Sequence, residues 1–264
     1  MTYFDISNKT SALKFLSDFS KVHENSILNF VKENIVQTDI CTDSTEVNAM
    51  NFCNEFGLQK SDLGTENILL CAIHYTSNDD ENKSIKDFGL RDLQYILSHN
   101  TPLRNFLKEF NVEFDIGNKS MCVNGKKYNI EYKNYELSDP VTHIARKIYY
   151  DNQLSCFFNI ENIEDYLGNV HLRPEILYNI DELLKSTNLS QEWCKRSKSY
   201  EIKFYGKITD FTSYSFPNDK KTIVENMIDM ALSVIAECAC GEIFAYLKPD
   251  TIIPFENILQ INEM

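Results

Sequence analysis

The residue of this chain best suited to chemistry is His74, an imidazole that follows an apolar run over residues 68–73. Such a run predicts a buried strand, and a lone histidine at a strand end is more often structural than catalytic. Its neighbours change that interpretation. Thr76 lies two residues further on, a short helix over residues 85–90 follows, and a late strand begins with Glu242. We therefore predict a site in which His74 and Glu242 form a pair.

The elements that must position these residues are helices first and strands later. Apolar residues recur at helical spacing over residues 13–22 and 27–35, and a third helix over residues 44–56 ends at Gly57. Asp5 or Ser7 is the expected N-cap of the first helix. The first sixty residues therefore predict a helical N-terminal region, over residues 1–62.

Strands and helices alternate irregularly after Gly64. Asn124-Gly125 predicts a hairpin inside residues 112–132, whereas Thr101-Pro102 and Asp139-Pro140 predict helix starts. Further strands are expected at 155–160, 200–211, 242–247 and 252–261, and further helices at 83–88, 93–97, 176–184 and 221–235. The predicted fold class is α+β, with the second domain over residues 63–264.

Net charge limits the partners that we expect. The chain has 39 acidic and 26 basic residues, giving a formal charge of −13. Binding to bulk nucleic acid relies on Lys and Arg neutralising phosphates, so neither bulk nucleic acid nor an anionic membrane is an expected partner. We interpret the short basic stretch over residues 195–198 as a solvated surface. A local nucleotide site stays open, because it needs only one or two cations and some backbone amides.

Cysteine usage and hydropathy predict a cytoplasmic protein. Residues 1–10 are polar and acidic, unlike a secretory signal, and no apolar stretch approaches the ~20 residues that span a bilayer. Several of the eight cysteines lie inside apolar runs, where a reduced thiol behaves as a small hydrophobe. Cys238 and Cys240 lack the second ligand pair of a structural zinc site, so we predict no metal.

Four short segments, in this order, resemble the ADP-ribosyltransferase-like fold. That group contains poly(ADP-ribose) polymerases, RNA 2′-phosphotransferases and bacterial toxins. Many members have His and Thr two apart on a strand, then a short helix that finishes in isoleucine, a spacer and Gly-Leu. The segments are His74-Tyr75-Thr76 with the following SIKDFGL over residues 84–90, YEIKF over 200–204, GEIFAY over 241–246 and IIPFENI over 252–258. The resemblance implies a split β-sheet domain after the helical N-terminal region.

The resemblance also implies a reaction with NAD as substrate. Departure of nicotinamide leaves an oxocarbenium-like ribose, which a carboxylate stabilises where positive charge develops. Glu242 is the catalytic residue that we expect in this role, and it could also orient or deprotonate the acceptor. A ring nitrogen of His74 would donate a hydrogen bond to a ribose hydroxyl or a phosphate, with Thr76 as a polar contact beside it.

Two further contacts to NAD are open. Arg173 could bind a phosphate, because an Arg fork matches that geometry. The aromatic residue that would stack on nicotinamide has no clear counterpart, and Phe157, Phe158 and Tyr166 are alternatives.

Each assignment has a structural alternative. Glu242 could be a solvated strand residue, and Glu237, five residues earlier, competes for its role. Arg173-Pro174-Glu175 also fits a helix start, with Glu175 favouring the helix dipole. His99 and His143 lie in helix-like contexts and are interpreted as surface residues.

Two functions therefore follow from the sequence. The first is an NAD-dependent ADP-ribosyltransferase that modifies a macromolecule, as in a toxin or a phage-defence or counter-defence factor. The acidity favours a protein acceptor, or a small nucleotide-like one, over bulk DNA or RNA. The alternative is a non-catalytic acidic interaction protein that binds a basic protein partner or a nucleotide.

Overall fold

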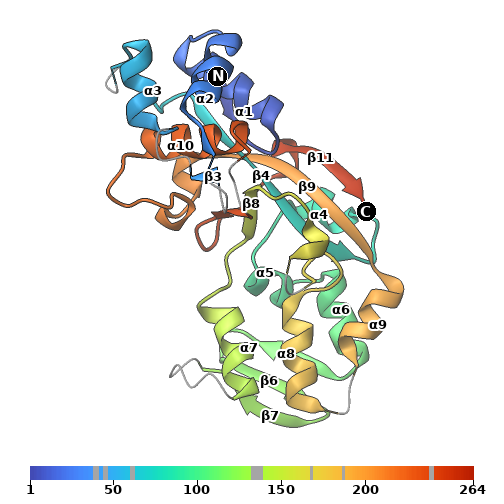
Figure 1. Ribbon diagram of the computed structural model, residues 1–264. Helices are drawn as coiled ribbons and strands as arrows, with labels where there is room; N and C mark the ends of the chain where they lie inside the picture. Colours follow the sequence, from blue (N-terminus) through green and yellow to red (C-terminus); the bar gives the residue numbers. More distant parts are fainter. Residues whose placement is uncertain are drawn as a thin grey trace. The chain divides into compact units, whose positions relative to one another are not determined.

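The computed structural model describes residues 1–37, 42–43, 47–59, 63–131, 139–166, 169–185, 188–237 and 241–264. These residues form helices and mainly antiparallel sheets, which confirms the predicted α+β class. The chain divides into two compact units, each built from separate stretches of sequence (Figure 1). The first unit contains Met1–Ile73, Ser155–Glu161 and Lys203–Leu247, and the second contains His74–Leu154, Asn162–Ile202 and Lys248–Met264. The predicted ADP-ribosyltransferase-like domain over residues 63–264 stays a prediction.

The first unit combines a helical layer with sheet strands. Its helices are α1 (Lys9–Ser20), α2 (Glu24–Asn34), α3 (Ala49–Phe56) and α10 (Ile223–Ile235), with short 3-10 turns η3 (Ile208–Asp210) and η4 (Ser213–Ser215). α10 packs against α1 and α3 (Figure 1). A capping box starts α10, because Thr222 accepts from the Glu225 amide and Glu225 accepts from the Thr222 amide.

The expectation that the first sixty residues are all helical is wrong at three places. β1 (Thr2–Phe4) is a strand that pairs in parallel with β4 (Ile68–Asn78), and β2 (Val36–Gln37) pairs with β3 (Thr42–Asp43). β1 forms because Phe4 is buried between the rings of Phe15 and Phe158, at 5.0 and 5.3 Å between ring centroids. Phe158 lies far along the sequence from Phe4, so helical spacing does not reveal this contact.

The N-cap of α1 also differs from the expected one. Asn8 caps the helix by accepting from the Ser11 amide at 2.9 Å. Asp5 instead accepts from Lys203 Nζ at 2.6 Å, which commits it to an ion pair with β9 (Lys198–Lys207).

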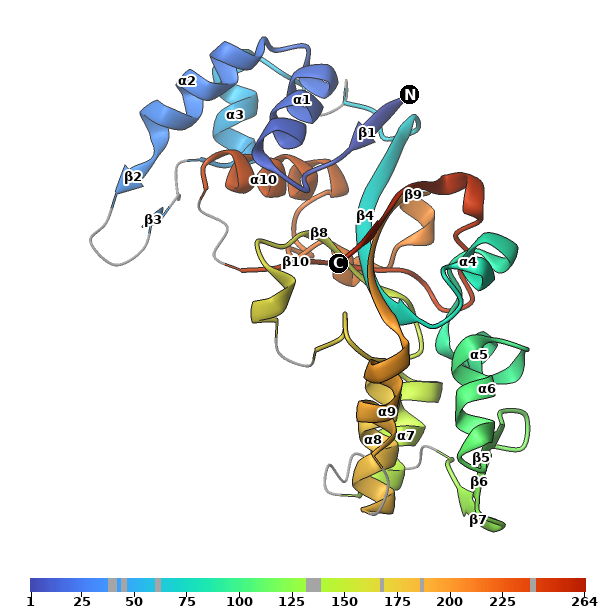
Figure 2. The same ribbon diagram turned by 90° about the vertical axis from the view of Figure 1, so that its right-hand side faces the viewer.

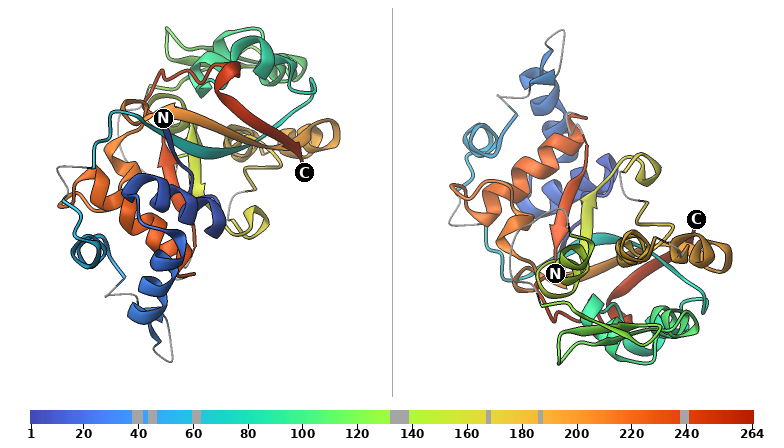
Figure 3. Two further views of the ribbon diagram at one scale, coloured as in Figure 1. Left: turned by 90° about the horizontal axis from the view of Figure 1, so that it is seen from above. Right: turned by 90° about the horizontal axis from the view of Figure 1, so that it is seen from below.

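The main sheet has the strand order β10-β8-β4-β9-β11, with β1 paired to β4 outside this path. In the first unit, β10 (Ile243–Tyr246) runs antiparallel to β8 (Ser155–Asn159), and Ile73 of β4 pairs with Phe157 of β8. The antiparallel β8 and β10 lie side by side in both views of Figure 3. β10 begins at Ile243, so Glu242 precedes the strand that was expected to start with it.

The second unit contains most of the shorter elements. They are α4 (Lys83–Phe88), α5 (Leu93–Ser98), α6 (Pro102–Glu109), β5 (Val112–Asp115), β6 (Ser120–Val123), β7 (Lys126–Asn129), α7 (Pro140–Tyr149), η2 (Ile163–Asp165), α8 (Glu175–Leu184), α9 (Leu189–Arg196), η5 (Phe255–Asn257) and β11 (Ile258–Glu263). The expected helix starts at Thr101-Pro102 and Asp139-Pro140 are confirmed, and Asn124-Gly125 forms the turn between β6 and β7.

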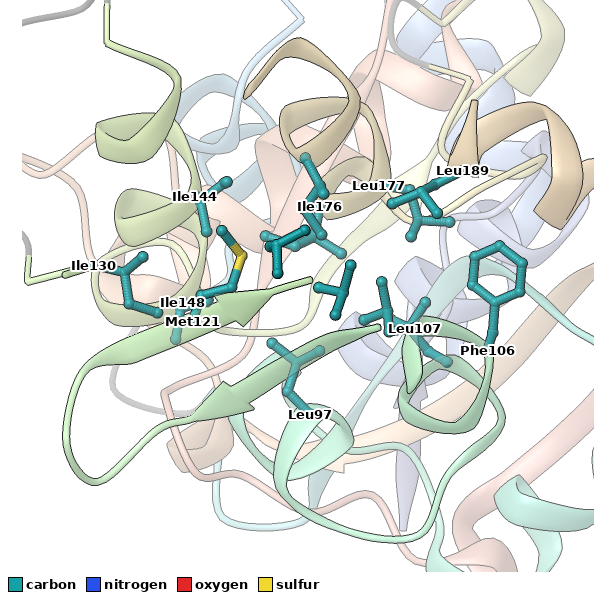
Figure 4. Packing of buried hydrophobic residues seen from close by; sticks show 14 of the residues in the cluster. Leu97, Phe106, Leu107, Met121, Ile130, Ile144, Ile148, Ile176, Leu177 and Leu189 are labelled. Carbon is teal, nitrogen blue, oxygen red and sulfur yellow. The ribbon is translucent and has the colours of Figure 1, made fainter. Parts of the chain in front are cut away.

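The core of the second unit lies between these helices and the β5-β6-β7 sheet. α7, α8 and α9 lie side by side (Figure 2). Side chains from α5 to α9 and from β6 converge on one apolar cluster (Figure 4). Trp193, the single tryptophan of the chain, is fully buried in this cluster, with its ring against Phe106.

No helix within the described part of the chain combines the length and the apolarity needed to cross a membrane.

Candidate functional site

His74 lies within β4 and not at the end of a strand. β4 continues two residues past Thr76, to Asn78. Tyr75 and Thr76 favour strand conformation, and Ser77 accepts a hydrogen bond from Trp193 Nε1 at 2.8 Å. Because the tryptophan comes from α9, tertiary contact extends the strand beyond the point that the apolar run predicts.

His74 and Thr76 share one face of β4. Successive side chains of a strand point to opposite faces. Tyr75 and Ser77 are buried, whereas His74 and Thr76 are half-buried. The two candidates are separated by roughly 7 Å along the strand, from its rise per residue. An imidazole and a hydroxyl at this spacing can contact neighbouring polar groups of one ligand.

The opposite face of β4 carries an interaction that the sequence did not reveal. The Tyr75 hydroxyl donates to Glu201 Oε2 at 3.0 Å, and Asn262 Nδ2 donates to Glu201 Oε1 at 3.0 Å. Burial and the carboxylate of Glu201 raise the pKa of Tyr75, which keeps its proton on the phenol. Both oxygens of this carboxylate are thus held by donors from β4 and β11. The signal in the sequence for this interaction is Glu201 itself, a charged residue inside the YEIKF strand.

Glu242 is an exposed residue just before β10. It belongs to the first unit, whereas His74 belongs to the second. The prediction that the two side chains share one pocket therefore stays a prediction. Its competitor Glu237 forms an exposed ion pair with Lys9, at 2.8 Å between Nζ and Oε1. That pair assigns Glu237 to the surface of the first unit.

Arg173 lies two residues before α8, in a loop over residues 169–174. Its guanidinium carbon is 5.1 Å from the centre of the Tyr178 ring, a cation–π arrangement. One guanidinium nitrogen, Nη1, is buried and has no hydrogen-bond partner among the described residues. Arg173 therefore keeps a donor that a ligand could use, and its contact with a phosphate stays a prediction.

His171 is a further candidate, two residues before Arg173, that the sequence did not single out. It is 7% exposed, and its Nδ1 has no hydrogen-bond partner within the described part of the chain. Burial lowers the pKa of His171, and the carboxylate of Glu164 acts in the opposite direction. The imidazole is therefore neutral near pH 7. Sequence carried no signal for it, because its burial results from tertiary packing.

The three aromatic alternatives for stacking on nicotinamide differ in environment. Phe157 and Phe158 of β8 are buried and pack against rings of the first unit, at 5.4 Å from Phe244 and 5.6 Å from Phe211. Tyr166, directly after η2, is half-buried. Since a stacking residue must present a ring face to the ligand, Tyr166 is the most suitable of the three.

The basic stretch over residues 195–198 is neutralised by acidic partners. Arg196 bridges Asp79 at 2.9 Å and Glu109 at 2.8 Å. Lys195 pairs with Glu192 and Lys198 with Glu263, at 2.6 and 3.0 Å. These cations are therefore engaged in ion pairs within the second unit.

His99 and His143 each lie against a neighbouring side chain. His99 stacks on Tyr95 at 3.8 Å between ring centroids, and His143 Nδ1 lies 3.4 Å from Glu182. Among the residues that the structure describes, no group of three or more His, Cys, Asp or Glu is placed to hold a metal ion. Cys238 and Cys240 lie outside the described residues.

Comparison of the chain with protein-family models, with curated proteins and with solved structures found no match in any of the three.

Proposed function

We propose that the protein is an NAD-dependent ADP-ribosyltransferase-like enzyme that modifies a macromolecular acceptor. In this proposal His74 and Thr76 contact the ribose or phosphates of NAD, and Glu242 stabilises the positive charge that develops as nicotinamide leaves. Arg173 and Tyr166 supply a phosphate contact and an aromatic face.

The observation that carries the proposal is a contact between two of the four resembling segments. Leu90 and Ile253 are joined by two backbone hydrogen bonds, at 2.9 and 3.2 Å. Gly89 adopts φ +73°, and a Cβ at this position would lie 2.2 Å from the Ile253 carbonyl oxygen. The Gly-Leu that ends the first segment is therefore shaped to receive the last one, although some 160 residues separate them by their numbers. Both segments belong to the second unit, with His74.

The faces of β4 support the same assignment. Tyr75 is committed to Glu201 on one face, which leaves His74 and Thr76 together on the more open face. A polar pair on the open face of a strand, followed by a loop and the Gly89-Leu90 junction, is the order in which the resemblance places its nucleotide contacts.

Nicotinamide release and label transfer test the proposal. The protein is incubated with NAD labelled in the adenylate moiety and with cell lysate, and free nicotinamide and labelled macromolecules are measured. We expect both products with the unmodified chain. Glu242→Gln should lower the rate by roughly 10²–10³, the effect of removing one electrostatic group from a reacting centre.

Glu237→Gln is the matched control, because it removes an exposed carboxylate from the same unit and disrupts its ion pair with Lys9. It should leave the rate unchanged. Absence of both products, or equal rates for Glu242→Gln and the unmodified chain, would contradict the proposal.

The alternative, an acidic interaction protein, is favoured by a different observation. Ile252, Phe255 and Leu259 are large apolar side chains that are exposed near the C-terminal strand, in a chain of net charge −13. Exposed apolar residues within an acidic surface fit a basic protein partner. This function is supported if NAD is not consumed and a basic protein binds with an affinity that falls as salt increases.

A further inference from the structure

Four buried polar side-chain atoms of the second unit lack a hydrogen-bond partner among the described residues, and three of them belong to a loop and a helix that are in contact. His171 Nδ1, Arg173 Nη1 and Ser190 Oγ have no hydrogen-bond partner among the described residues. Leaving such an atom buried and unpaired is unfavourable, and most buried polar groups in proteins find a partner. A ligand that accepts hydrogen bonds from them would supply the missing partners.

The three atoms come from two elements that touch. His171 and Arg173 lie in the loop over residues 169–174, and the Cys194 thiol of α9 donates to the Leu172 carbonyl in that loop, at 3.6 Å. Ser190 lies four residues before Cys194, one turn earlier on the same side of α9. The loop and this side of α9 therefore face each other.

The start of α8 adds an electrostatic contribution. Pro174 is the N-cap residue and provides no side-chain hydrogen bond to the first turn. The amide groups and the dipole of a helix N-terminus favour an anion. Glu175 in the first turn is ion-paired at 2.7 Å with Lys147, which it shares with Asp151, so its repulsion of an incoming anion is reduced in part.

We propose that the loop over residues 169–174 and the start of α8 form a binding site for a phosphate-type oxyanion. Arg173 donates from its buried Nη1, His171 from its ring nitrogen in the appropriate tautomer, and Ser190 from its hydroxyl. A guanidinium, an imidazole and a hydroxyl all donate, and a phosphoryl group offers several acceptor oxygens. The cation–π contact with Tyr178 holds the guanidinium in place.

The identity of the ligand that carries this phosphate rests on the proposed function. The anion site itself does not. If the protein consumes NAD, the anion is the pyrophosphate of NAD. Binding of a simple phosphate anion to the loop does not depend on turnover.

Isothermal titration calorimetry with inorganic pyrophosphate, at low ionic strength, tests the site. Arg173→Gln removes the guanidinium and should weaken binding by about tenfold or more, as expected for a charge-assisted hydrogen bond. Arg91→Gln is the matched control. Arg91 also lies over a tyrosine ring, 4.4 Å from the centre of Tyr95, but its Nε already donates to the Phe88 carbonyl at 2.7 Å. This control should bind as the unmodified chain does.

A variant that should bind pyrophosphate more tightly shows that weaker binding in Arg173→Gln is not caused by misfolding. Glu164 lowers the positive potential at His171, so Glu164→Gln should bind pyrophosphate several-fold more tightly. No heat of binding at millimolar pyrophosphate, or equal affinity in Arg173→Gln and Arg91→Gln, would overturn the site.

The two proposals can fail separately. If pyrophosphate binding requires Arg173 but NAD releases no nicotinamide, the anion site stands and the enzyme proposal is contradicted. If nicotinamide release is unchanged in Arg173→Gln and pyrophosphate does not bind, the enzyme proposal stands and the anion site is contradicted.

Discussion

Substitution of Gly89 by alanine is the sharpest test of the junction between the segments that end at Leu90 and begin at Ile252. Gly89 has φ +73° and ψ −170°, a region that residues with a side chain occupy only at a cost of about 1–3 kcal/mol. The added Cβ would also lie 2.2 Å from the Ile253 carbonyl oxygen and 3.0 Å from its carbon. Such a contact forces the backbone of Ile253 to move.

The movement breaks a hydrogen bond between buried residues. The Leu90 amide donates to the Ile253 carbonyl at 2.9 Å, and both residues are buried. An unpaired buried amide adds about 1–3 kcal/mol to the loss. We therefore expect Gly89→Ala to lower the free energy of unfolding by about 2–6 kcal/mol, the sum of these two effects.

Gly125→Ala separates the conformational effect from the close contact. Gly125 also has positive φ, +81°, but nothing lies within 4 Å of the Cβ that alanine would add. It should lose only about 1–2 kcal/mol. Urea unfolding followed by Trp193 fluorescence measures both variants, because this buried tryptophan reports on the unit that contains both glycines. Equal destabilisation of the two variants would refute the role assigned to the Ile253 contact.

Two further predictions concern titration and thiol reactivity. Burial lowers the pKa of His171 below its ordinary value of 6.5, so near and below this pH the unfolded chain binds a proton that the folded chain does not. His171 therefore destabilises the fold as pH falls through 6.5. The free energy of unfolding lost between pH 7.5 and 5.5 should be smaller in His171→Gln, and an equal loss would contradict the assignment. For the thiols, iodoacetamide at pH 8 should modify exposed Cys194 well before Cys71, whose pKa burial raises to about 12. Mass spectrometry of peptides measures the order, and early modification of Cys71 in the folded protein would contradict it.

Local signals in the sequence predicted the elements whose stabilising contacts lie within a few residues. Thr101 accepts from the Arg104 amide at 3.3 Å, and Asp139 accepts from the Val141 amide at 3.1 Å. Asn124 and Gly125 supply the positive φ angles, 49° and 81°, of the turn between β6 and β7. Each of these contacts depends on residue type and spacing alone, so a single sequence contains the required information.

Contacts between distant residues explain what the sequence did not predict. α9 shows only Leu189 and Trp193 as a buried apolar pair, too few for a clear helical period. Asp181 of α8 starts this helix by accepting from the amides of Leu189 and Ser190, at 2.7 and 2.9 Å. The pair of Tyr75 and Glu201 is similar, because it depends on strand neighbours that are 126 residues apart. The pattern of one strand does not specify the register of its partner.

The arrangement of β4 also determines how its polar residues should be interpreted. A strand that carries polar residues on both faces must partner them on each face or leave them to solvent or ligand. On one face, Tyr75 and Ser77 are satisfied within the protein, by Glu201 and Trp193. That pairing fixes the phase of the strand, since a shift by one residue would bury His74 and expose Tyr75. His74 and Thr76 lie on the other face of β4, where both side chains are half-buried. Tyr75→Phe removes the hydrogen bond to Glu201. It should affect His74 and Thr76 only if β4 changes its position.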